Sequence, residues 1–254
     1  MLTTWRFPND GQCGINSLDV QTDGHNRSSG INVLRNAWRF LGYGDPRSAR
    51  VWFVGLEEAS EFKTLEEIRE LQSRESIHCR GCPGERTAVY DIISKIVIGL
   101  RDGDFGAGWR SYRDTQLFSQ DSDAFQANLY PLGKKSEADW PVLYQKWFGM
   151  SREQYYHWQQ EETPHRFNHL RRRRKHHGNP LAICFGKGHW DHFRRCFAAD
   201  GEQPRDVGRF RYYAESRVIL TEFFRSTRMS DSEIRKLIRL ISRLGLNPFA
   251  SIGQ

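Results

Sequence analysis

Residues 50–60 read RVWFVGLEEAS, and this stretch decides what kind of sheet the chain builds. Its first half places four apolar side chains in succession, from Val51 to Val54, before a glycine. A strand that is apolar on both faces is typical of a parallel sheet covered by helices on both sides. Two glutamates, Glu57 and Glu58, follow directly, so carboxylates are expected at the end of a buried strand.

Three further runs share this apolar character and predict three more strands. The runs are AFQANLYP at 124–131, LAICFG at 181–186 and RVILTEFF at 217–224. Helices are expected where apolar residues recur every three or four positions. Such spacing covers 31–41, 86–101, 140–148 and 234–244. The alternation predicts an α/β fold, a three-layer α/β/α domain with a central four-stranded parallel sheet.

The chain is expected to fold as a single domain over residues 31–254, since 254 residues can bury one large core. Residues 1–30 are rich in Gly, Asn, Asp and Ser and lack periodicity, so this segment is expected to be irregular. Residues 57–85 form a long polar insertion after the first strand. Loops of this length are often functional.

The composition favours a polyanionic partner. The chain has 38 Lys and Arg against 31 Asp and Glu, a net charge of +7. Such an excess favours nucleic acid as a partner, although a basic surface without that role fits the composition equally well. Five cysteines, an odd number, favour a reducing cytoplasm over a disulfide framework. No apolar run approaches the roughly 18–20 residues of a membrane span, so no membrane association is expected.

Polar side chains follow each of the four expected strands. They are Glu57 and Glu58 after the first strand, Asn128, Lys134 and Lys135 after the second, Lys187 and His189 after the third, and Arg225, Ser226 and Arg228 after the fourth. Ligands of open parallel sheets bind outside the carboxyl ends of the strands. One face would therefore combine a central carboxylate with DNA-binding residues around it, from Lys134 to Arg228.

Three motifs at these strand ends carry a resemblance to a known family. They are GLEEA at 55–59, NLYPL at 128–132 and AICFGKGHWDHF at 182–193. Their order and spacing resemble the uracil-DNA glycosylase superfamily, most closely its single-strand-selective branch. The likeness covers residues 30–245. It implies that the chain has a uracil-DNA glycosylase-like fold and that the protein acts as a DNA glycosylase.

The resemblance implies a monofunctional enzyme that hydrolyses an N-glycosidic bond and leaves an abasic site. Glu57 falls at the catalytic position, where a carboxylate near the sugar can stabilise positive charge and orient a water. Asn128 falls at the position that reads the base, with Gly55 and Ala59 beside the base. The target nucleotide must be single-stranded or flipped out of a duplex.

The substrate implied is uracil or a 5-modified pyrimidine. Ala59 stands where strict uracil enzymes keep a tyrosine, and its small side chain leaves room beside C5 of the base. Hydroxymethylcytosine-derived bases of phage DNA, including glucosylated ones, would then fit, as in a phage-defence glycosylase. The sequence departs from the family at FFRSTRMS, 223–230, which lacks the usual His-Pro-Ser, and at Glu58, which replaces a proline.

Two other functions stay open. The first is a non-catalytic nucleic-acid-binding module on the same fold, which the missing His-Pro-Ser motif favours. The second is an α/β enzyme acting on free nucleotides, although the cations around one face exceed what a small ligand needs. Whichever of these functions holds, the protein is expected to be a cytoplasmic monomer.

A few other residues are candidates for base stacking, for a wedge in the base stack, for metal binding or for DNA binding. Phe62 and Trp109 can stack on a base but fit core packing better, while Phe224 or Met229 can act as a wedge in the base stack. Cys79 and Cys82 form one CxxC pair without a second, so neither a metal site nor a cofactor is expected. The basic run 171–177 is expected at the opposite edge of the sheet, as solvated charge at a helix C-terminus.

Overall fold

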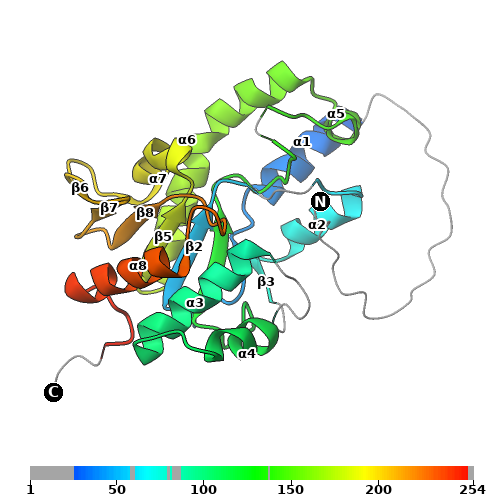
Figure 1. Ribbon diagram of the computed structural model, residues 1–254. Coiled ribbons are helices and arrows are strands. Elements are labelled where there is room, and N and C mark those ends of the chain that lie inside the picture. The colour runs from blue at the N-terminus through cyan, green and yellow to red at the C-terminus, as the bar shows by residue number, and fades with distance from the viewer. Residues whose placement is uncertain (1–25, 58–60, 79–80, 82–86, 137, 251–254) are drawn as a thin grey trace.

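The structure is a computed structural model that describes residues 26–57, 61–78, 81, 87–136 and 138–250 (Figure 1). Its strands are β1 (Gly42–Tyr43), β2 (Val51–Gly55), β3 (Ser76–Ile77), β4 (Ala124–Asn128), β5 (Leu181–Phe185), β6 (Arg205–Val207), β7 (Phe210–Tyr213) and β8 (Val218–Thr221). Its helices are α1 (Asn26–Ala37), α2 (Leu65–Ser73), α3 (Ala88–Asp102), α4 (Gly108–Thr115), α5 (Val142–Phe148), α6 (Arg152–His176), α7 (Trp190–Phe197) and α8 (Asp231–Arg243). None of the described helices is both long and apolar enough to cross a bilayer.

The four strands predicted from apolar runs are confirmed. They lie side by side in the order β4-β2-β5-β8, and each neighbouring pair is parallel. The predicted size of the sheet is wrong, because the described residues form eight strands in the order β3-β1-β4-β2-β5-β8-β7-β6. β1 and β3 have two residues each and β6 is largely exposed, so none of them produces an apolar run.

Helices cover both faces of the sheet, which confirms the three-layer arrangement. α3 packs against α4 and α8 on one face, and α6 packs against α7 on the other (Figure 1). This follows from right-handed crossovers, since the chain moves one way from β2 to β4 and the other way from β4 to β5 and β8. The carboxyl ends of the four parallel strands therefore meet at one edge.

Two boundaries differ from expectation. The first helix begins at Asn26 and ends at Ala37, so the segment expected to be irregular already turns helical before residue 30. The polar insertion 57–85 contains α2 and β3. α2 starts at a capping box, in which the Thr64 side chain accepts from the Glu67 backbone N–H while the Glu67 carboxylate accepts from that of Thr64. Thr-x-x-Glu is a sequence signature of a helix N-terminus.

The basic run 171–177 ends α6 just before β5, at the edge opposite the strand carboxyl ends, as predicted. Its interpretation as solvated charge is only partly right. Arg172 and Lys175 are exposed, but Arg174 is buried and donates hydrogen bonds to the carbonyl oxygens of Pro180 and Ser216. Arg174 therefore ties the end of α6 to the loops that enter β5 and β8.

A second buried arginine holds the other side of α6. Arg166 donates to the backbone oxygens of Asn128 and Leu129 at the end of β4, at 2.8 and 3.1 Å. It also donates to the oxygens of Trp38 and Phe40 after α1. Burial lowers the pKa of Arg166, and these carbonyl oxygens satisfy its guanidinium. Arg166 thereby fixes the end of β4, which carries a predicted site residue.

Candidate functional site

A cavity of about 200 Å³ lies where the strand-end loops of β2, β4 and β5 meet α6. Its lining comes from Leu56, Glu57, Tyr130, Lys134, Tyr156, Gln159, Gln160, Thr163, His189 and His192. Glu57 follows β2, Tyr130 and Lys134 follow β4, and the two histidines follow β5. The parallel strands thus bring together side chains that are far apart in the sequence, as the sheet topology predicts.

Glu57 is the central acidic group of this cavity. Its carboxylate Oε2 lies 3.2 Å from Lys134 Nζ, and only 9 % of the Glu57 side chain is exposed. The Lys134 side chain is 2 % exposed, with its ammonium 5.3 Å from the ring centroid of Tyr156. A buried ion pair of this kind holds both side chains in place, because separating the two charges loses their attraction without returning either of them to water.

Lys134 was expected among the DNA-binding cations around the carboxylate. The structure instead buries it inside the cavity, against Glu57 and over the rings of Tyr155 and Tyr156. From this position it acts on the carboxylate and does not face the exposed rim. The prediction is corrected in this respect: the loop after β4 folds back over α6, and sequence position alone did not reveal that direction.

Other polar groups of the lining can exchange hydrogen bonds with a ligand. Tyr130 Oη lies 3.1 Å from His192 Nδ1, and the His189 and His192 rings lie 5.8 Å apart. Burial raises the pKa of Tyr130, and the charge of Glu57 adds a smaller contribution in the same direction. Tyr130 therefore keeps its proton and offers a hydroxyl to the cavity. His189, expected to bind DNA, lines the cavity and is half-buried.

Gln159 of α6 was not predicted as a site residue, but the structure identifies it as one that can contact a ligand. It lines the cavity, and its buried Oε1 accepts no hydrogen bond from the described residues. A buried acceptor without a partner that borders a cavity is available to a hydrogen-bond donor of a ligand. The long polar sequence of α6 shows no apolar stripe, and this is why the sequence did not reveal its role.

Gly55 and Asn128 are paired neighbours at the ends of β2 and β4. Asn128 is 7 % exposed, and a Cβ at position 55 would lie 2.8 Å from its Oδ1 and 3.1 Å from Phe185 Cζ. Gly55 is therefore required by the close approach of these side chains. Asn128 is not among the residues that line the cavity, so base reading by Asn128 stays a prediction.

Gly55→Ala is expected to destabilise the protein by about 1–3 kcal/mol, because the added methyl group must displace Asn128 or Phe185. Thermal unfolding monitored by circular dichroism measures this loss. The control is Gly188→Ala, where nothing lies within 4 Å of an added Cβ and no change in melting temperature is expected. Equal stabilities of the two variants would contradict the packing described here.

The other predicted DNA-binding residues lie on the exposed surface. Lys135, Lys187, Arg225, Ser226 and Arg228 are all exposed. Lys135 pairs with Glu61 at 3.3 Å and Lys187 lies over the Trp190 ring. We call these five residues the strand-end rim. Ala59 and Glu58 lie outside the described residues, as do Cys79 and Cys82.

The residues predicted to act as a wedge are buried, and a neighbouring phenylalanine is exposed instead. Phe224 and Met229 are buried, and Phe224 stacks on Phe185 with centroids 4.4 Å apart. Phe223 is 39 % exposed, with the Arg225 guanidinium 5.1 Å from its ring centroid. One of two neighbouring phenylalanines is buried and the other exposed, and the sequence did not tell which of them faces outward. Phe62 and Trp109 are buried in the core.

No protein-family model, curated protein or solved structure matches this chain. In the part of the chain that the structure describes, no three His, Cys, Asp or Glu side chains gather as metal ligands would.

Proposed function

We propose that the protein is a monofunctional DNA glycosylase that hydrolyses the N-glycosidic bond of uracil or a 5-modified pyrimidine. One observation carries this proposal: a buried carboxylate, Glu57, projects from the carboxyl end of a parallel strand into a cavity with aromatic and imidazole walls. The resemblance to the uracil-DNA glycosylase superfamily assigns its catalytic residue to this position. The motif-bearing strands are parallel neighbours, so their motifs end at one edge, as that resemblance requires.

Glu57 suits the sugar side of the reaction. Breaking the N-glycosidic bond builds positive charge on the deoxyribose and negative charge on the departing base. A carboxylate beside the sugar stabilises that positive charge and can orient a water for attack on C1′. Lys134 holds the carboxylate in one place, so little reorganisation is needed as charge develops.

Other residues that line the cavity can bind the flipped base. The rings of Tyr130 and Tyr156 offer stacking surfaces to a flipped base, and stacking of this kind tolerates different bases. The unpaired Oε1 of Gln159 can accept a hydrogen bond from a base N–H. His189 and His192 can donate to the negative charge that the leaving base acquires. Asn128, if it turns toward the base, would contribute a second amide.

The strand-end rim suits DNA outside the cavity. Its exposed cations can contact phosphates, and Phe223 can insert beside the base that leaves the stack. We expect Phe223→Ala to slow excision from duplex DNA by roughly tenfold, since unstacking a base step costs a few kcal/mol. Excision from single-stranded DNA should change little, because no stack has to be opened.

Single-turnover rates on the two substrates measure this difference. Val142→Ala removes another exposed apolar side chain, on α5, and serves as the control with wild-type rates on both. If Phe223→Ala slows both substrates equally, the ring does not assist flipping.

A panel of oligonucleotides tests the proposed function. Each carries uracil, hydroxymethyluracil, hydroxymethylcytosine or glucosylated hydroxymethylcytosine, and alkali reveals abasic sites after incubation. Cleavage of at least one member is expected. The small Ala59 of the sequence predicts that the 5-modified bases are accepted, and a preference for uracil alone would contradict that expectation. Sodium borohydride should trap no protein–DNA adduct, although Lys134 lies in the cavity. A trapped adduct would mean that the enzyme is a lyase as well.

A non-catalytic nucleic-acid-binding module is the second candidate. It is favoured by Arg225, Ser226 and Arg228, which stand where the glycosylase family keeps its His-Pro-Ser motif. Tight, salt-sensitive binding of every oligonucleotide without any abasic product would support this candidate over the enzyme.

A further inference from the structure

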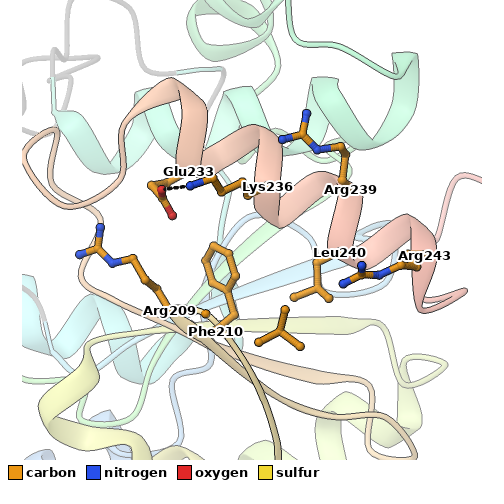
Figure 2. A pocket seen from close by; sticks show the side chains of 9 residues that line it. Arg209, Phe210, Glu233, Lys236, Arg239, Leu240 and Arg243 are labelled. Atoms are coloured by element: carbon orange, nitrogen blue, oxygen red, sulfur yellow. Dashed lines mark hydrogen bonds and ion pairs between the residues drawn. The ribbon is translucent and has the colours of Figure 1, made fainter.

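A second hollow, larger than the catalytic cavity, lies on the far side of β8. It has a volume of about 460 Å³ and runs between the β6–β7 hairpin and α8. Its lining comes from Val207, Gly208, Arg209, Phe210, Glu233, Lys236, Arg239, Leu240 and Arg243. We call it the α8 groove. Figure 2 shows Phe210 rising toward α8 in the middle of the groove, with Arg209 and Arg243 at its two ends.

The lining separates into an apolar floor and a basic margin. Phe210 and Leu240 are buried and form the floor. Four cations and one carboxylate, Glu233, complete the polar part of the lining. Glu233 pairs with Lys236 at 2.7 Å. Arg239 and Arg243 are exposed and make no ion pair with any described residue. Their charges keep an unneutralised excess along the groove, which favours an anionic ligand.

The α8 groove is connected to the strand-end rim by one carboxylate. Glu222 binds Arg209 at 2.6 Å and also lies 3.9 Å from Arg228 of the rim. Cations therefore follow one another from Arg228 through Arg209 to Lys236 and Arg243, with the carboxylates of Glu222 and Glu233 paired between them. A strand whose target base enters the cavity can continue along these cations.

We infer that the α8 groove binds the phosphodiester backbone of single-stranded nucleic acid that flanks the target nucleotide. From Lys236 to Arg243, α8 rises about 10 Å. A strand with duplex-like stacking carries one phosphate per roughly 3.4 Å of its axis and an unstacked strand fewer, so this length faces at most about three phosphates. The apolar floor can hold the sugar or the face of an unstacked base. A free phosphate would need neither this length nor the floor.

The inference rests on the proposed function only in taking nucleic acid as the partner. Its test uses a fluorescent polythymidine strand without any target base, so the result does not depend on excision. The double variant Arg239→Ser/Arg243→Ser removes the two groove cations that make no ion pair with any described residue. Arg172→Ser/Lys175→Ser removes the same charge from the exposed end of α6. Anisotropy titrations between about 50 and 200 mM salt give the affinity and its salt dependence.

The groove variant should bind about tenfold more weakly, and its log K against log salt should be less steep by roughly 1.4, the value for two lost phosphate contacts. The α6 variant should match the wild type. Wild-type affinity and slope in the groove variant would overturn the inference, as would equal losses in both variants. So would a groove variant that binds polythymidine normally but no longer binds polyglutamate, because the ligand would then be an acidic peptide. If the expected slopes appear and no base is ever excised, the groove inference stands and the glycosylase proposal falls.

Discussion

Glu57→Gln is expected to lower the rate of base excision by roughly 10²- to 10⁴-fold while the protein still binds DNA. Glutamine has nearly the same shape as glutamate, so the cavity keeps its form. It carries no charge to stabilise the developing sugar cation, and its amide is a poor base for the attacking water. The substitution also leaves the Lys134 ammonium without the carboxylate that lies 3.2 Å away.

Single-turnover kinetics on the best oligonucleotide substrate measure this effect separately from binding. Glu61→Gln is the matched control, because Glu61 is a nearby glutamate that also pairs with a lysine, Lys135, outside the cavity. It should retain the wild-type rate. Full activity of Glu57→Gln would remove Glu57 from the mechanism, and equal losses in both variants would attribute the effect to general charge.

Arg166→Met is expected to lower the free energy of unfolding by roughly 3–5 kcal/mol, the range for breaking a buried charged network. The variant leaves four buried carbonyl oxygens without their donor, at Trp38, Phe40, Asn128 and Leu129. Methionine fills most of the space, so the loss arises from unsatisfied acceptors rather than from a cavity.

Urea unfolding of Arg166→Met and of Arg172→Met, an exposed arginine on the same helix, measures the difference. Arg172→Met should stay within about 0.5 kcal/mol of the wild type, as surface substitutions usually do. If Arg166→Met does not fold, Arg166→Lys keeps the charge but loses the forked geometry and should still be clearly less stable than the control. Equal stability of Arg166→Lys or Arg166→Met and the control would contradict the role given to this side chain.

The parallel strands could be predicted because each is buried on both faces. Such burial requires consecutive apolar residues, a pattern that elements on the surface do not have. The sequence missed β1 and β3 because two-residue strands have no periodicity, and it missed the length of α6 because that helix has no apolar stripe. The sequence also predicted that the arginines at the end of α6 are solvated, and for Arg174 this was wrong. Arg174 is buried because it donates hydrogen bonds to carbonyl oxygens that other parts of the chain bring close to it.

The candidate site was predictable only in part. Glu57 was found because the position directly after a buried parallel strand is where ligands bind. Its pairing with Lys134 depends on how the loop after β4 folds back, which local sequence does not specify. Gln159 became visible only once α6 lay across the strand ends. The outward direction of Phe223 likewise depends on how Phe224 stacks on Phe185.

Release of a free base tests the proposed glycosylase activity most directly. Wild-type protein is incubated with each modified oligonucleotide, and mass spectrometry of the small-molecule fraction quantifies the pyrimidine set free. We expect that at least one pyrimidine is released, in an amount equal to the abasic sites in the same strand. Tight binding of all the oligonucleotides with no free base from any of them would contradict it.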